Sequence, residues 1–220
     1  MSSSSLFRTG RRALGAALAL LFAAATQAAT FQIINIDDPG VGFNDPTPAA
    51  PVGGNSGTTL GEQRQIVFLK VAEIWGQNLR SDVPIRVLAT FTALPCTSSG
   101  GVLGAALAYN QLANFPNAEK ADTWYPAALA NKLAGVALID DPDPAGSADI
   151  LSFFNSSLGQ PGCFDGGGFY LGIDNNAPPE LTNLLSVVLH EFGHGLGFAT
   201  FTDSGTGQQD VPVGGAPEGY

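Results

Sequence analysis

The stretch that decides the fold is SVVLHEFGHGLGF, residues 186–198, and it holds both histidines of the chain. Within it, His190, Glu191 and His194 form an H-E-x-x-H run. On a helix, residues four apart lie on one face, one turn above the other. Two imidazoles placed in this way can hold one zinc ion, and the glutamate can take a proton from a zinc-activated water. We therefore expect Zn²⁺ as the cofactor, His190 and His194 as its ligands, and Glu191 as the general base.

The residues around this motif predict a helix. Pro178, Pro179 and Glu180 are typical of a helix start, because proline is tolerated in the first turn and an acid there suits the dipole. The residues at helical spacing that form one apolar face are Leu181, Leu184, Leu185, Val188 and Phe192. A different stripe carries Asn183, Val187, His190 and His194. Gly195 and Gly197 predict the end of the helix. The alternative is a buried helix whose polar residues have no partners, which would be costly.

The motif resembles that of a known clan of proteases. HEFGHGLGF, residues 190–198, is similar to the H-E-x-x-H-x-x-G stretch of metzincin zinc endopeptidases, and its L-G-F ending looks most like leishmanolysin-type peptidases. ADILSFF, residues 148–154, before FDGGG, residues 164–168, looks like the approach to the active-site helix in matrixins. The resemblance covers residues 149–198. It implies a zincin-like fold, the same roles for the three motif residues, and a chain turn below the metal at Gly197.

The chain departs from the metzincin pattern at the third ligand. Most metzincins place a histidine three residues after the glycine, where this chain has Thr200, and no further histidine exists. The methionine turn of the clan is also missing, because Met1 is the only methionine. Leishmanolysin-like members carry an inserted segment here, so the resemblance implies that the missing parts follow Tyr220. The later carboxylates, which could ligate zinc but are more typical of solvated loops, are Asp203, Asp210 and Glu218.

The first 29 residues predict a secretory signal peptide. A basic start with Arg8, Arg11 and Arg12 precedes an apolar stretch at 13–25, and small residues follow at Ala28 and Ala29. The apolar stretch is shorter than the ~20 residues of a spanning helix. We therefore expect cleavage near Ala28 or Ala29 and a secreted protein, with the periplasm or cell surface also possible destinations. A retained membrane anchor is the alternative.

Length and charge limit the number of domains and the partners that the mature chain can have. Residues 30–220 fit one domain with a sizeable core. The formal charge moves from −10 to −13 on cleavage, because the leader carries three arginines and no acid. An acidic surface repels nucleic acid and anionic membrane, so neither is an expected partner. In an oxidising compartment the two cysteines, Cys96 and Cys163, favour one disulfide over two separate buried thiols.

Patterning along the chain predicts the α+β class. The segments with strand patterns are 31–37, 85–93, 103–112, 150–155 and 169–173. A capping box at Thr59 and Glu62 begins one amphipathic helix, and 126–134 predicts a short second one. This order favours a twisted sheet backed by helices, in agreement with the zincin-like fold. Asn155-Ser156-Ser157 also forms a glycosylation sequon, meaningful only in a eukaryotic secretory pathway.

The reaction that these features favour is hydrolysis of a protein or peptide substrate. In matrixin-like relatives an edge strand binds the extended substrate, and the resemblance places such a strand within residues 149–173. Two other readings remain open. The chain could be a secreted binding module that kept a zincin-like fold and lost the metal, or a zinc-dependent hydrolase of a non-peptide amide.

Overall fold

The computed structural model describes residues 27–199 and 205–208, and its centre is a four-stranded sheet with the order β1-β2-β8-β5. Strands β1 (Phe31–Asn35), β2 (Ile85–Thr92) and β8 (Ile150–Asn155) are parallel, and β5 (Gly104–Ala108) pairs antiparallel with β8. Parallel neighbours need long crossover connections, and those from β1 to β2 and from β2 to β8 are both long enough to carry a helix or a strand. The chain therefore has the α+β class that its sequence predicts.

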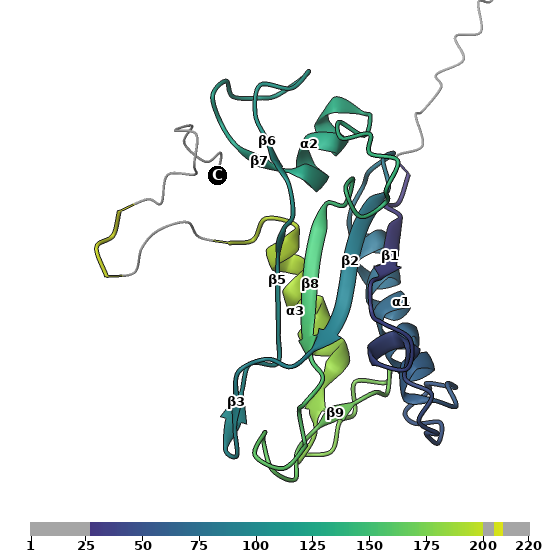
Figure 1. Ribbon diagram of the computed structural model, residues 1–220. Helices are drawn as coiled ribbons and strands as arrows, with labels where there is room; N and C mark the ends of the chain where they lie inside the picture. Colours follow the sequence, from purple (N-terminus) through teal and green to yellow (C-terminus); the bar gives the residue numbers. More distant parts are fainter. Residues whose placement is uncertain (1–26, 200–204, 209–220) are drawn as a thin grey trace, which may run out of the picture.

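Helices α1 (Leu60–Asn78) and α3 (Leu184–Gly195) pack on one face of this sheet (Figure 1). Alternate side chains of the strands point into the layer between sheet and helices, since side chains alternate along a strand. The strand residues buried there include Phe31, Val87, Phe91, Ile150 and Phe154. The helical residues that meet them include Val67, Phe68, Val71, Val188 and Phe192. Helix α2 (Ala127–Ala134) lies at one end of the sheet (Figure 1).

Local signals explain helix α1. The Thr59 hydroxyl accepts from the Glu62 backbone N–H at 3.2 Å, and the Glu62 carboxylate accepts from the Thr59 N–H at 3.2 Å. This is the capping box that the sequence predicts, and it satisfies two N–H groups that a helix start leaves unpaired. Trp75 packs against the core from the same helix.

Short elements complete the described part of the chain. The remaining helical turn is η1 (Gly42–Asn44). The short strands are β3 (Cys96–Thr97), β4 (Gly100–Gly101), β6 (Gln111–Leu112), β7 (Tyr125–Pro126), β9 (Phe169–Tyr170) and β10 (Thr182–Asn183). They form three two-stranded pairs, β3 with β4, β6 with β7, and β9 with β10.

Several predicted strands are shorter than expected. The stretch 103–112 divides into β5 and β6, and between them Tyr109 still donates its N–H to the Asp149 carbonyl at 2.8 Å. The stretch 169–173 contributes only β9, which pairs with β10 outside the main sheet. Strand β8 has the predicted bounds, 150–155.

Of the two strands that the structure describes within 149–173, where an edge strand was expected, β9 pairs on one side only, with β10, whereas β8 is not an edge strand of the main sheet. Strand β8 lies between β2 and β5, so both of its edges are paired. Among the described residues, the strand at this edge of the sheet is β5, and α3 lies close beside it (Figure 1). Strand β5 takes the edge of the main sheet because it pairs with the outer side of β8, although it comes earlier in the sequence.

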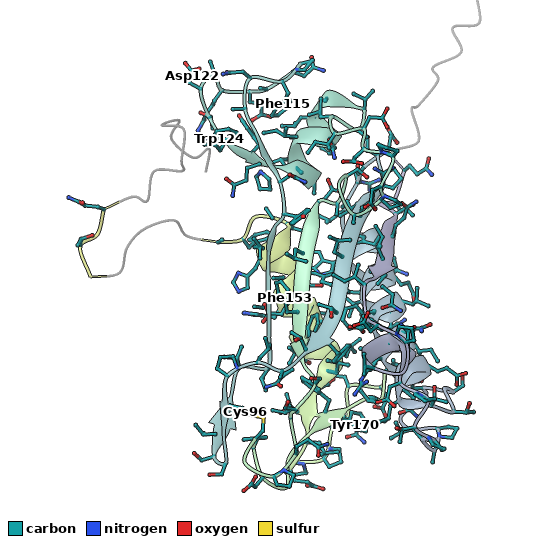
Figure 2. All side chains as sticks on the ribbon, in the orientation of Figure 1. Cys96, Phe115, Asp122, Trp124, Phe153 and Tyr170 are labelled. Atoms are coloured by element: carbon teal, nitrogen blue, oxygen red, sulfur yellow. A yellow bond between two sulfur atoms is a disulfide. The ribbon has the colours of Figure 1, made fainter. Side chains whose placement is uncertain are left out.

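The predicted disulfide between Cys96 and Cys163 is present. It joins the β3–β4 hairpin, which follows β2, to the loop that follows β8, and Cys96 lies beyond the end of the sheet (Figure 2). The sequon residue Asn155 is 1% exposed, and its amide donates to the Val102 carbonyl, so it does not offer a glycosylation site in the folded chain. Within residues 27–199 and 205–208, no helix combines the length and apolar character that crossing a membrane requires.

Candidate metal-binding helix

Helix α3 carries the whole H-E-x-x-H motif, but it begins later than the sequence predicts. Pro178 accepts from the Leu181 N–H in a turn, and Thr182 and Asn183 pair with β9. Asn183 then caps the helix, because its side-chain oxygen accepts from the Leu185 N–H at 3.0 Å. The predicted start at 178–180 is therefore wrong, since a cap and a short strand pairing take precedence over the two prolines.

The apolar face of α3 fixes which way the helix is turned. Leu184, Val188 and Phe192 are fully buried, and Leu185 is 5% exposed. The Phe192 ring packs between Phe31 and Phe68, at centroid distances of 6.1 and 5.9 Å. Because this face is held by the core, the stripe with the histidines faces away from it: His190 is exposed, and Glu191 and His194 are half-buried.

Two further contacts set the position of α3 along the sheet. The Trp75 indole N–H donates to the Leu189 carbonyl at 3.2 Å, which ties α3 to α1. Gly195 lies directly on β8, where a Cβ atom would stand 2.3 Å from Cγ2 of Ile150. Glycine is therefore required at 195 for this close approach, and the last turn of α3 is held against the start of β8.

The two imidazoles converge. Nε2 of His190 and Nε2 of His194 are 3.0 Å apart, and the two ring planes are nearly perpendicular. Two nitrogens that bind one tetrahedral zinc ion at its usual bond length stand roughly 3.4 Å apart. A separation slightly below this value means that a small opening of the side chains would admit the ion. The structure thus brings both predicted ligands to one point.

A backbone carbonyl fixes the orientation of the His194 ring. Its Nδ1 lies 2.7 Å from the backbone carbonyl of Phe198. A carbonyl only accepts, so Nδ1 carries the hydrogen and Nε2 keeps its lone pair. Metal-binding histidines usually have such a partner, which sets the tautomer and the ring orientation. Sequence reasoning did not identify this contact, because the acceptor is a backbone atom.

A glycine turn places that carbonyl. Leu196 ends the helix, and Gly197 adopts a φ of +110°, a region that favours glycine. The Phe198 N–H then donates to the Gly193 carbonyl at 3.0 Å, which brings the chain back over the last turn. The predicted chain turn at Gly197 is present, and it is the sequence signal from which the His194 contact could have been suspected.

The described residues supply two metal ligands, His190 and His194. Within the described part of the chain, no group of three His, Cys, Asp or Glu side chains could hold a metal ion. Thr200, Asp203, Asp210 and Glu218, the positions considered for a third ligand, lie outside the described residues. The Glu191 carboxylate is half-buried and makes no hydrogen bond or ion pair with any residue that the structure describes. Two imidazoles and a neighbouring carboxylate fit part of a catalytic zinc site, which normally has three protein ligands.

An apolar cavity of about 490 Å³ lies at the C-terminal end of α3. Leu196, Gly197 and Phe198 line one side, and Leu79 and Leu129 are among the residues opposite. Neither histidine is among its lining residues, although Phe198, whose carbonyl contacts His194, lines it.

Comparisons with known proteins add no family to this geometry. No family model matches the chain, and no curated protein or solved structure matches it significantly.

Proposed function

We propose that this protein is a secreted zinc-dependent endopeptidase with a zincin-like fold. The observation that carries the proposal is the pair of Nε2 atoms 3.0 Å apart, with Nδ1 of His194 held by the Phe198 carbonyl. The fixed tautomer turns the lone pair of His194 Nε2 toward Nε2 of His190, and a zinc ion would take the place of the hydrogen that the two nitrogens share without it.

Each motif residue has one role in the proposed reaction. His190 and His194 hold zinc, together with a third ligand from outside the described residues. Bound zinc supplies Lewis acidity, which polarises the scissile carbonyl and makes water easier to deprotonate. Glu191 accepts the proton from the attacking water and delivers it to the leaving amine. Glu191 lies beside His190 on a helix whose position is set by the contacts of Gly195 and Trp75. This position would keep the Glu191 carboxylate near the metal without a competing partner.

The substrate that fits this arrangement is an extended peptide bound along β5. This strand lies at the edge of the sheet next to α3 and has the sequence GAALA, without charge or proline. Its backbone groups on the outer edge can pair with a peptide, and four of its five residues are glycine or alanine, which allow close approach. Strand edges that avoid such pairing usually carry charges or proline. This proposal replaces the edge strand expected within residues 149–173.

The test is Glu191→Gln in the exported protein, with Glu180→Gln as a matched control. The amide keeps the shape of the side chain but cannot accept the proton, so peptidase activity should fall by about 10²–10⁴-fold with zinc content unchanged. Glu180 is exposed and precedes α3, so its amide variant should keep full activity. Activity would be followed with a quenched fluorescent peptide, and zinc by atomic absorption.

Histidine variants separate metal binding from catalysis. His190→Ala and His194→Ala each remove a ligand, so both should lose zinc as well as activity. Wild-type proteolysis by Glu191→Gln would contradict the role of Glu191. Wild-type protein that binds no zinc, even with zinc supplied, would contradict the proposal and favour the binding-module alternative.

A further inference from the structure

Among the residues that the structure describes, Ala29 is the first that is buried. Ala29 is 6% exposed and belongs to the hydrophobic core, whereas Gln27 and Ala28 before it are exposed. Its backbone N–H donates to the Leu79 carbonyl at 3.0 Å. Its own carbonyl lies so close to Gly76 that a Cβ there would be 2.5 Å away. The fold therefore depends on Ala29, while Ala28 contributes only a β-bridge with Arg80.

Ala29 also lies at the negative end of α1. Leu79 is the C-cap of this 19-residue helix, and the last turn carries no basic side chain, although the first turn carries Glu62. Arg80 follows directly after the cap. A positive group beside the last carbonyls of a helix stabilises it, because it offsets the aligned peptide dipoles. A charged amino group at Ala29 would be such a group.

We propose that the leader is removed between Ala28 and Ala29, and that the new α-ammonium group caps the C-terminus of α1 at Leu79. A leader peptidase adds water across the Ala28–Ala29 peptide bond, which leaves a carboxylate on Ala28 and an amine on Ala29. The amine is largely protonated at neutral pH. It keeps a hydrogen for the Leu79 carbonyl and adds a positive charge. This inference rests on the expected export signal and does not depend on the hydrolase function.

The structure chooses among the bonds that the sequence allows. Leader cleavage sites of the A-x-A type need small residues at the first and third positions before the cut. A cut after Ala28 places Ala28 and Thr26 there, and a cut after Ala25 would place Ala25 and Ala23 there but would leave the new charge three residues before the buried Ala29. A cut after Ala29 would place Gln27 at the third position, and it would also remove the buried methyl group of Ala29 and its hydrogen bond to Leu79.

The position of the cut is tested by sequencing the N-terminus of the exported full-length protein, which should begin at Ala29. In Ala28→Leu the large side chain occupies the first position before the cut, so processing should stop or move. In Gln27→Leu, the matched control, the tolerant second position changes and the chain should still begin at Ala29. A start at Thr30, normal processing of Ala28→Leu, or a retained Met1 would each overturn the proposal.

The capping role is tested with mature full-length chains released from a fusion by a site-specific protease. One begins at Ala29, a second at Gln27, and a third at Thr30. The chain that begins at Gln27 keeps every bond of Ala29 but moves the charge two residues away. The chain that begins at Ala29 should have a Tm about 1–4 °C higher than the chain that begins at Gln27, and high salt should reduce this difference. The chain that begins at Thr30 should have the lowest Tm of the three. Equal Tm values for the first two chains would overturn the cap.

Discussion

Asp149 is the buried charge on which the start of β8 depends. It is 1% exposed, and its carboxylate accepts from the Arg86 N–H and from the Asn131 side-chain amide, both at 2.8 Å. These bonds join β2, α2 and β8 at one point. Burial raises the pKa of Asp149 above its ordinary value of 3.8, against the opposing effect of the Arg86 and Asn131 hydrogen bonds. The folded state therefore holds this proton more tightly than the unfolded chain does.

That shift gives a pH-dependent prediction. The contribution of Asp149 to the free energy of unfolding is greatest below pH 3.8 and falls as the pH rises through the higher pKa of the folded state. Asp149→Asn removes this dependence and turns an NH₂ toward one of two donors, at a cost of about 1–3 kcal/mol. Denaturant unfolding at pH 4 and pH 7 should show a larger difference between wild type and variant at pH 4. A difference that grows with pH would contradict the assignment.

The residues of the candidate site differ in how far the sequence reveals them. The spacing of His190 and His194 predicts one face and a shared point, because helical geometry is local. The Phe198 carbonyl is invisible in the same stretch, since any residue supplies a carbonyl and only the Gly197 turn aims it at His194. Side-chain chemistry can be read from a sequence, whereas backbone atoms that orient a side chain require the fold.

At the scale of elements, the close contact between Gly195 of α3 and Ile150 of β8 gives a prediction, and Gly193 of the same helix provides its control. Gly195→Ala would place a methyl group 2.3 Å from Cγ2 of Ile150, so the last turn of α3 must move away from the strand. That displacement should cost about 1–3 kcal/mol of stability. It also disturbs the support of His194, and loss of such support typically weakens metal binding by about 10–100-fold.

Gly193→Ala is the control on the same helix. A Cβ there would meet only Trp75, at 3.8 Å, which is ordinary contact. Alanine is the better helix former by about 0.5–1 kcal/mol, so this variant should be as stable as wild type or more so, with zinc affinity unchanged. Zinc titration and thermal unfolding of both variants would check the pair. Equal zinc affinities for Gly195→Ala and wild type would show that the contact between α3 and β8 does not position His194.

Elements with local signals agree with the sequence, and those decided by distant partners do not. Helix α1 has its capping box, and β8 is a short, mostly apolar run, ILSFFN, so both appear as predicted. The start of α3 and the identity of the edge strand depend on pairings between segments far apart in the chain. Local propensity cannot choose between such pairings, because their free energy comes from contacts that exist only in the folded chain.

At the scale of the whole molecule, the candidate site and the disulfide lie at opposite ends of the sheet. Strands β2 and β8 are parallel, so the loops that follow them leave from the same end, where Cys96 and Cys163 join (Figures 1 and 2). Helix α3 runs back toward the other end, where Gly195 meets Ile150 at the start of β8. A six-residue strand such as β8 spans roughly 20 Å. The disulfide should therefore contribute to stability and leave the site unaffected.

The double variant Cys96→Ser, Cys163→Ser tests this separation. The disulfide closes a loop with a sequence separation of 67 residues. On the chain-entropy model its removal lowers the free energy of unfolding by about 4 kcal/mol, because the unfolded chain regains the freedom that the cross-link removed. Zinc affinity measured well below the unfolding transition should match wild type, since His190, His194 and the Phe198 carbonyl bond to one another and not to the two loops within the described part of the chain. A large fall in stability with unchanged zinc affinity is the expected result. Parallel losses of both at low temperature would mean that the two ends of the sheet are coupled, and that the loops beyond β2 and β8 help to position α3.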